Sequence, residues 1–104
     1  MNTQLKKGSL EMCVLRFIHK EDQYGYQLAQ NVSAYFSIAE GTLYPLLRRL
    51  VKIGYLNTYF QESNEGPARK YYTLTESGIE RMHALVEEWQ IYSAAVNNIL
   101  ADTK

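Results

Sequence analysis

Five basic side chains stand in two short segments of this chain, and their chemistry is that of phosphate and base recognition. Arg48, Arg49 and Lys52 lie within residues 40–53, and Arg69 and Lys70 follow together farther along. Basic side chains that contact phosphates position a protein on nucleic acid, whereas an arginine that forms two hydrogen bonds with a guanine edge also reads sequence. We expect Arg48 to reach base edges and the other four to hold phosphates. Each cation taken alone would be interpreted as a solvated surface charge.

Residues 40–53 have the spacing of an amphipathic helix that presents these cations. Its apolar residues recur every three or four positions and share one face, namely Leu43, Leu46, Leu47, Leu50 and Ile53. The opposite face gathers Gly41, Tyr44, Pro45, Arg48 and Lys52, with Arg49 at its flank. Gly41 would allow close approach, and Tyr44 is placed to meet phosphate or base edges. We therefore expect this helix to enter a groove of DNA.

Pro45 is unusual inside a helix, because proline removes a backbone hydrogen bond. We interpret it as shaping the first turns for close approach, with a tolerated kink as the alternative. The capping-box spacing of Ser37 and Glu40 makes Ser37 the expected N-cap of this helix.

The neighbouring segments predict the elements that position this helix. Apolar periodicity predicts helices over residues 5–20 and 24–32, with Glu11 outside the apolar stripe of the first. Tyr35 and Phe36, in the turn that follows, are expected in the core. Period-two alternation predicts strands over residues 55–61 and 69–74, joined by a long, flexible tip.

The last helix, expected from a cap at Thr75 to residue 100, is too long for the other elements to cover. It would measure about 38 Å at 1.5 Å per residue, and its apolar residues form one continuous stripe. One face of it must therefore find a partner. The residues that we expect at a dimer interface are Leu10, Met82, Leu85, Val86, Trp89, Tyr92, Val96 and Ile99.

The order of three helices, a hairpin and a fourth helix is that of a winged helix-turn-helix. We expect an α+β, mainly α, fold with a three-helix core, a two-stranded wing and a long C-terminal dimerisation helix. Residues 1–75 would form the DNA-binding domain and residues 76–104 the dimerisation helix and tail, within one compact unit.

Composition and charge narrow the classes of function. The 104 residues are 46% hydrophobic and 21% charged, as in an ordinary globular domain. The net charge is zero, but residues 1–75 hold nine Lys/Arg against six Asp/Glu, and residues 76–104 hold two against five. One cysteine and two histidines argue against a metal site. We expect no cofactor and, for want of a nucleophile paired with a base, no enzyme. No apolar run reaches the roughly 18 residues of a membrane span, so we expect a cytoplasmic protein.

Several segments resemble the PadR family of bacterial transcriptional regulators. They are GTLYPLLRRL at residues 41–50, GYL at 54–56 and GPARKYYTLT at 66–75, with GSLE at 8–11 and YGYQL at 24–28. The single C-terminal helix resembles that of the small subfamily. The resemblance implies a homodimer, paired mostly through the last helix, that represses a promoter with a two-fold symmetric operator in double-stranded DNA. Many members respond to phenolic acids, drugs or other small apolar molecules.

The resemblance also implies roles for individual residues. Those that match the recognition helix and the wing are Thr42, Tyr44, Pro45, Arg48, Arg69 and Lys70. Tyr24 stands where the family often has histidine, and we include it among the expected DNA contacts. Ala39 stands where a capping serine or asparagine is common. Trp89 resembles a tryptophan that lines a drug-binding pore at the dimer interface of some small members, which implies a small aromatic or drug-like effector. An interface anchor is the alternative for Trp89.

Two functions from different classes remain open at this point. The first is a sequence-specific DNA-binding regulator, expected to be a homodimeric repressor whose DNA affinity an effector modulates. The second is a winged-helix module that binds protein and not DNA, which net neutrality and the acidic last helix favour slightly. Phosphate binding should weaken steeply with added salt, whereas apolar docking should not, so salt dependence separates the two.

Overall fold

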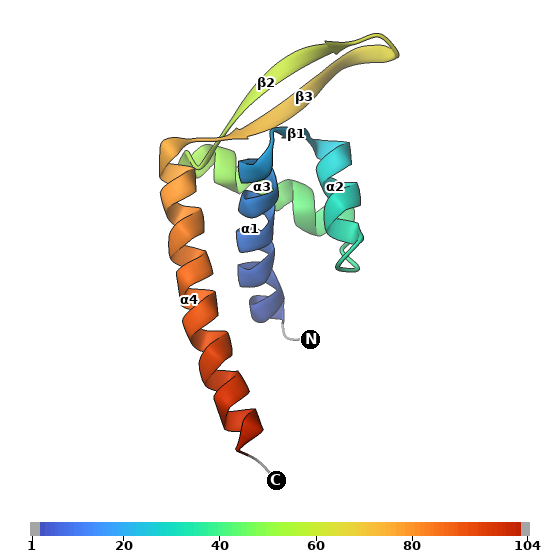
Figure 1. Cartoon of the computed structure of the whole chain (residues 1–104). Helices are drawn as coiled ribbons and strands as arrows, with labels where there is room; N and C mark the ends of the chain where they lie inside the picture. The colour runs from blue at the N-terminus through green and yellow to red at the C-terminus, as the bar shows by residue number, and fades with distance from the viewer. Residues whose placement is uncertain (1–2, 103–104) are drawn as a thin grey trace.

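The computed structural model describes residues 3–102, with side chains for residues 8–39 and 41–102. Four helices and three strands follow one another along the chain (Figure 1): α1 (Thr3–Lys20), β1 (Gln23–Tyr24), α2 (Gly25–Ser33), α3 (Glu40–Ile53), β2 (Leu56–Ser63), β3 (Gly66–Leu74) and α4 (Glu76–Ala101). The expected winged helix-turn-helix order is therefore confirmed. None of the described helices is long and apolar enough to cross a membrane.

The wing contains one more strand than the sequence predicted. The sheet is antiparallel with the order β1-β3-β2, and Gln23 and Tyr24 pair with Tyr72 and Tyr71 of β3. Tyr24 is extended, with φ −87° and ψ 159°, so α2 begins at Gly25 and not at Tyr24. A strand of two residues is too short to show an alternating pattern, which is why the sequence did not indicate it.

The tip of the wing is tighter than expected. The strands β2 and β3 continue to Ser63 and Gly66, which pair with each other, so only Asn64 and Glu65 connect them. The other residues that predicted a long loop lie on two exposed strands that project beyond the helices (Figure 1).

The helices meet in one apolar core beneath the sheet. Its fully buried side chains come from α1, α2, α3 and β2, namely Val14, Leu15, Ile18, Leu28, Val32, Leu47, Leu50 and Leu56. The helix α1 packs against α2, α4 and β3, and Leu15 is buried as fully as its neighbour Val14. The leucines of the apolar stripe of α3 are buried as the period of 3.6 predicts, whereas Ile53, its last residue, is 50% exposed.

Two predictions about the connection between α2 and α3 are wrong. The side chains of Tyr35 and Phe36 are exposed, Tyr35 by 75%, because Leu28 and Val32 of α2 already fill the core beside this turn. The N-cap of α3 is Ala39, with φ −74° and ψ 146°, and not Ser37. The helix starts two residues later than the capping box indicated, and the amide of Thr42 donates to the carbonyl of Ala39 at 2.9 Å.

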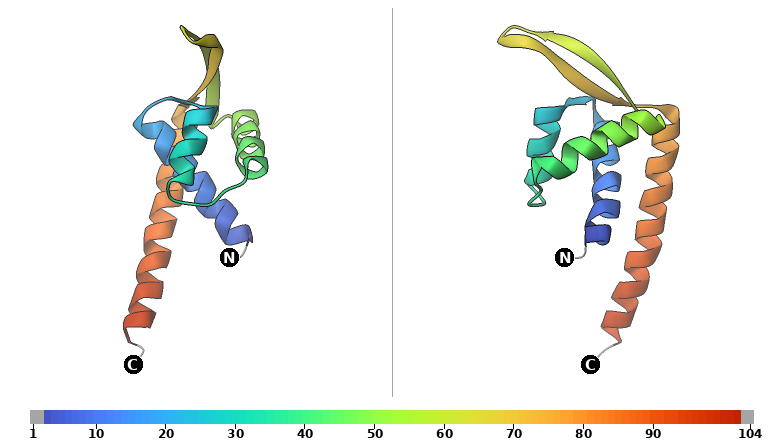
Figure 2. Two further views of the ribbon diagram at one scale, coloured as in Figure 1. Left: turned by 90° about the vertical axis from the view of Figure 1, so that its right-hand side faces the viewer. Right: turned by 180° about the vertical axis from the view of Figure 1, so that it is seen from behind.

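The helix α4 gives the molecule its length. The principal extents are 58 × 28 × 20 Å, and in Figure 2 the C-terminal half of α4 runs past the end of α1. Thr75 is the N-cap as predicted, because its Oγ1 accepts a hydrogen bond from the amide of Gly78 at 3.0 Å.

Candidate nucleic-acid interface

The helix α3 presents a polar face on the outside of the domain. Viewed from behind, it crosses in front of α1 and lies beneath the hairpin (Figure 2, right). Gly41, Pro45, Arg48 and Lys52 are exposed along this face, opposite the buried leucines. The helix ends at Gly54, whose φ of 101° is the left-handed conformation that glycine adopts without strain. The amides of Gly54 and Tyr55 then donate to the carbonyl of Leu50.

Gly41 lies in the first turn of α3 and borders open space. Apart from its chain neighbours and the backbone of α3, no described residue has an atom within 4 Å of a Cβ built at Gly41. Packing against the described residues therefore gives no reason for a glycine there. Pro45 follows four residues later, and the amide that proline lacks would have donated to the carbonyl of Gly41. Gly41 therefore leaves the start of the exposed face without a side chain.

Tyr44 and Arg48 lie on the edge of α3 that faces the wing. The half-buried ring of Tyr44 packs closely on Gly25, where an added Cβ would stand 3.0 Å from its Cε1. Burial raises the pKa of Tyr72 on β3, Tyr44 raises it further, and the Arg48 guanidinium acts in the opposite direction. Arg48 therefore lies beside the wing. The Tyr44 ring packs against α2, so only part of it is exposed.

The two cations of the wing point to opposite faces of the sheet. Lys70 shares a face with Tyr72 and Phe60, and its Nζ lies 5.8 Å from the Tyr72 ring centroid. Arg69 points the other way, with its guanidinium 4.7 Å from the centroid of the Tyr24 ring. The structure therefore brings Lys70 toward Arg48 and separates Arg69 from both. The period-two alternation of β3 predicts this separation, because adjacent residues of a strand point to opposite faces of the sheet.

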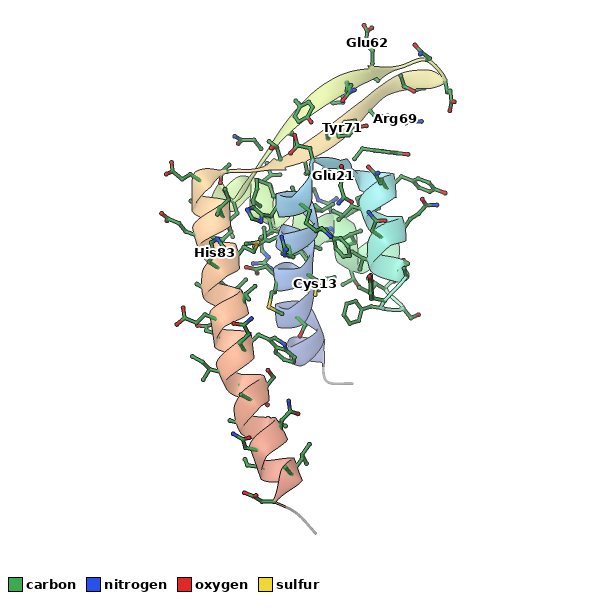
Figure 3. All side chains as sticks on the ribbon, viewed as in Figure 1. Cys13, Glu21, Glu62, Arg69, Tyr71 and His83 are labelled. Atoms are coloured by element: carbon green, nitrogen blue, oxygen red, sulfur yellow. The ribbon has the colours of Figure 1, made fainter. Side chains whose placement is uncertain are left out.

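Arg69 and Tyr71 lie near each other on β3 (Figure 3), and Arg69 belongs to a cluster of tyrosine rings on the side of the sheet opposite Lys70. The rings of Tyr59 and Tyr71 are stacked with centroids 5.5 Å apart, and Tyr24 lies 5.6 Å from Tyr71. The Tyr59 hydroxyl donates to Asp22 at 2.7 Å, and this hydrogen bond raises the pKa of Tyr59. Arg69 also approaches Glu65 at 3.9 Å. Tyr24 and Arg69 thus lie together, on the opposite side of the sheet from Lys70.

Arg49, on the other flank of α3, contacts an acidic residue that the sequence analysis had placed outside. Glu11 of α1 is buried, and its carboxylate accepts from Arg49 at 3.4 Å and from Arg81 of α4 at 3.0 Å. The prediction that Glu11 lies on the outer side of its helix is wrong, because the side chains of Arg49 from α3 and Arg81 from α4 both reach its buried carboxylate. The cations that make its burial tolerable are distant in sequence, so periodicity alone could not indicate them.

Thr42 is half-buried on the same flank. It borders a hollow of about 430 Å³ between α1 and α3, lined by Leu10, Gly41, Thr42, Pro45, Leu46 and Arg49. The described residues contain no group of three or more His, Cys, Asp or Glu side chains suited to a metal ion.

The residues expected at a dimer interface fall into three groups. Leu10 and Met82 lie in the core of this chain, because α1 and the start of α4 bury them against each other and α3. Leu85 and Val86 are partly buried against that core. Those farther along α4 reach solvent to varying degrees, namely Trp89, Tyr92, Val96 and Ile99.

Trp89 lies between two apolar clefts. One, of about 280 Å³, is lined by Gly8, Ser9, Met12, Leu85, Glu88, Trp89 and Tyr92. The other, of about 480 Å³, is lined by residues of α1, the α2–α3 turn and α4, among them Cys13, Phe17, Tyr35, Phe36 and Trp89. Burial raises the pKa of the Cys13 thiol, so it stays protonated at neutral pH. The exposed aromatic residues of the α2–α3 turn, which had been expected in the core, thus form one wall of the larger cleft.

A three-helix core, a helix with an exposed basic face and a sheet projecting beside it together define a winged helix-turn-helix protein. Comparison with known proteins identifies the family. Residues 14–84 match the transcriptional regulator PadR-like family, and this chain belongs to that family. It is therefore a DNA-binding transcriptional regulator and not an enzyme.

Individual relatives and solved structures are similar to this chain over most of its length. The smu.1704 protein of Streptococcus mutans UA159 is 40% identical, with a TM-score of 0.87 over 94% of this chain and 92% of that one. A PadR-like transcriptional regulator from Bacillus cereus strain ATCC 14579 is 37% identical, with a TM-score of 0.85 over 93% of this chain and 96% of that one. An uncharacterized protein X of Lysinibacillus sphaericus is 34% identical over 93 residues, which are 86% of this chain and 85% of the relative.

Proposed function

We propose that this regulator is a homodimeric repressor that reads a two-fold symmetric operator through the exposed face of α3. The observation that carries the proposal is one exposed face of α3 that presents Gly41, Arg48 and Lys52, with Tyr72 of the wing acted on by Arg48 and contacted by Lys70. A major groove about 12 Å wide admits one helix with its side chains. Arg48 is the residue proposed to reach base edges, and the two lysines are proposed to hold phosphates on either side of it.

The remaining candidates take secondary parts in this proposal. Arg69 and Tyr24 lie on the opposite face of the wing from Lys70, so any phosphate that they contact belongs to a different stretch of backbone. Tyr44 orients α3 against α2 and offers only its exposed edge to DNA. Thr42 and Pro45 border the flank at which Arg49 lies.

The long helix α4 supports the proposed dimer. Its exposed apolar residues include Trp89, Tyr92 and Leu100, and a second copy of the helix would cover such a stripe. Isologous pairing of two α4 helices relates the two α3 helices by a two-fold axis. On a symmetric operator they would enter successive major grooves about 34 Å apart.

The clefts beside Trp89 support an effector site of small aromatic or drug-like character. Trp89 is 46% exposed and contacts Tyr92 with ring centroids 6.2 Å apart, which leaves an aromatic surface for stacking. A ligand that changed the packing of α4 would alter the spacing of the two α3 helices and so bias the dimer between two arrangements. The alternative, a tryptophan that only anchors the dimer, predicts no quenching of its fluorescence by such ligands.

Titration of the protein into its own upstream DNA, compared with a scrambled duplex, tests the proposal. The upstream duplex should bind more tightly, and Arg48→Ala should lose about 1–3 kcal/mol of binding free energy together with most of that preference. Lys20→Ala, which removes a cation at the end of α1, is the matched control. Equal and weak binding of both duplexes, unchanged in Arg48→Ala, would refute the specific repressor.

The same titration distinguishes the protein-binding module. Phosphate contacts release counterions, so the logarithm of the binding constant should fall linearly with the logarithm of the salt concentration. A module that docks on protein through apolar surface would show no such slope with DNA.

A further inference from the structure

Glu11 joins three helices through a single carboxylate. One of its oxygens, Oε1, lies 3.4 Å from an Nη of Arg49 on α3, and Oε2 accepts from Nε of Arg81 on α4 at 3.0 Å. The Glu11 side chain is only 9% exposed, whereas those of Arg81 and Arg49 are 38% and 54% exposed. A carboxylate that is nine-tenths buried therefore has one close cation and one more distant, more exposed cation.

Removing Arg81 from Glu11 should destabilise the protein more than removing Arg49. A buried carboxylate left without a cation is strongly destabilising, so at least one arginine must stay. Arg81 makes the shorter hydrogen bond and is the less exposed, which makes it the permanent partner. Arg49 makes the longer contact, is more than half exposed and lies on the flank of the proposed DNA-binding face, so it can leave while Arg81 remains.

We propose that Glu11 and Arg81 are positioning residues for DNA binding, because they set how readily Arg49 leaves Glu11 for a backbone phosphate. The inference rests on the proposed DNA contact of α3. With Arg81 in place, Glu11 is compensated and Arg49 transfers to the phosphate. Without Arg81, Glu11 has only Arg49 to neutralise it, and the transfer becomes unfavourable. A residue on α4 thereby controls a phosphate contact on α3 without touching DNA.

The position of Arg81 links this exchange to the dimer helix. Arg81 lies one turn before Leu85, on the same helix that carries Trp89 and Tyr92. The hydroxyls of Thr75 and Ser77 donate to the carbonyl of Gly54 at 2.6 and 3.1 Å, which ties the start of α4 to the end of α3. Arg81 is about 9 Å along the helix from that joint. A tilt of α4 about the joint would therefore change the Arg81–Glu11 contact and with it the hold on Arg49.

The experiment measures the affinity of the full chain for its upstream duplex at several salt concentrations. Arg81→Gln should weaken binding about two- to fivefold, the range expected for one partly exposed ion pair. Its salt slope should also fall toward that of Arg49→Gln, which loses about one phosphate contact. Arg16→Gln, on α1, removes the same charge without a contact to Glu11 and should leave the slope unchanged.

Replacement of Glu11 should change DNA affinity in the opposite direction. Glu11→Gln releases Arg49 and should bind DNA more tightly than the wild type, which a merely damaged protein would not do. Its matched control is Glu80→Gln on α4, an exposed acidic residue. In the double variant Glu11→Gln/Arg81→Gln, the loss of DNA affinity caused by Arg81→Gln should disappear. The single variant Arg81→Lys, which keeps the charge, should retain most of the wild-type affinity.

Two results overturn the inference while leaving the proposed function intact. One is a wild-type protein that prefers its upstream DNA, combined with an Arg81→Gln effect equal to that of Arg16→Gln. The other is an Arg81→Gln loss that persists undiminished when Glu11 is also replaced. Absence of any salt-dependent preference in the wild type would instead refute the DNA contact itself.

Discussion

Two glycines in the first turns of helices α3 and α4 have opposite physical reasons to be glycine. A Cβ at Gly78 would collide with the backbone carbonyl oxygen of Tyr55, so the packing of α4 against the start of the wing requires a glycine there. Gly41 faces open space among the described residues. A glycine inside a helix costs about 0.5–1 kcal/mol relative to alanine, and nothing within the described fold compensates this at Gly41. Close approach by an external partner would.

Gly41→Ala should therefore separate stability from binding. We expect the free energy of unfolding to rise by up to about 1 kcal/mol, while DNA affinity falls about tenfold, as for one lost base contact. Urea denaturation and DNA titration of the same preparation measure the two quantities. Gly78→Ala should instead lower stability, which shows that the gain is specific to the open site. Undiminished DNA binding by Gly41→Ala would remove this residue from the proposed interface.

Among the elements, periodicity predicted the long helices that bury one face. The end of α3 at Ile53 and the N-cap of α4 agree with the sequence analysis, because a leucine stripe and a threonine N-cap act locally, whereas α3 begins after Ala39 and not after Ser37. Local patterns could not indicate β1, which exists only by pairing with β3, or the burial of Glu11, which depends on cations from two other helices. Likewise, the aromatic character of Tyr35 and Phe36 predicted a core position, but Leu28 and Val32 fill the core beside them.

The joint between the end of α3 and the start of α4 is a set of hydrogen bonds that fixes one helix relative to the other. Thr75 Oγ1 accepts from the amide of Gly78 and donates to the carbonyl of Gly54, so a single hydroxyl caps α4 and holds the end of α3. Gly54 can offer this carbonyl because its left-handed conformation turns the chain back toward α4. The amide of Thr75 also donates to the carbonyl of Tyr55 at 3.1 Å.

Thr75→Val keeps the shape of this side chain and removes both hydrogen bonds. We expect the free energy of unfolding to fall by about 1–2 kcal/mol, as for loss of a helix cap, with a further loss of DNA affinity because α3 is less firmly placed. Ser77→Ala, which removes the second donor to Gly54 and a 3.1 Å contact with the Thr75 hydroxyl but leaves the cap in place, should cost less than Thr75→Val. Chemical denaturation gives the first comparison and DNA titration the second. An equal cost for the two variants would mean that the cap contributes nothing beyond the shared carbonyl.

At the scale of the whole molecule, the acidic residues of α4 and the basic residues of α3 lie on different helices. Its 26 residues span about 39 Å, and most of the acidic residues after residue 75 are exposed along it. Pairing of α4 helices would place this acidic region at the centre of a dimer and the two basic α3 faces farther out. Such a separation keeps the negative charge away from the phosphates, although the net charge of the chain is zero.

Glutamate substitutions at two positions of α4 test this arrangement. Val96 continues the apolar stripe, whereas Ile91 is exposed about 140° away around the helix, at 100° per residue. Val96→Glu would bury a charge in the proposed interface, so light scattering should report half the wild-type mass, and DNA affinity should fall because two linked α3 helices become independent. Ile91→Glu adds the same charge to the uncovered face and should leave the mass unchanged. If Ile91→Glu dissociates the dimer and Val96→Glu does not, the partner helix packs on the other side of α4, and the predicted spacing of the two α3 helices fails with it.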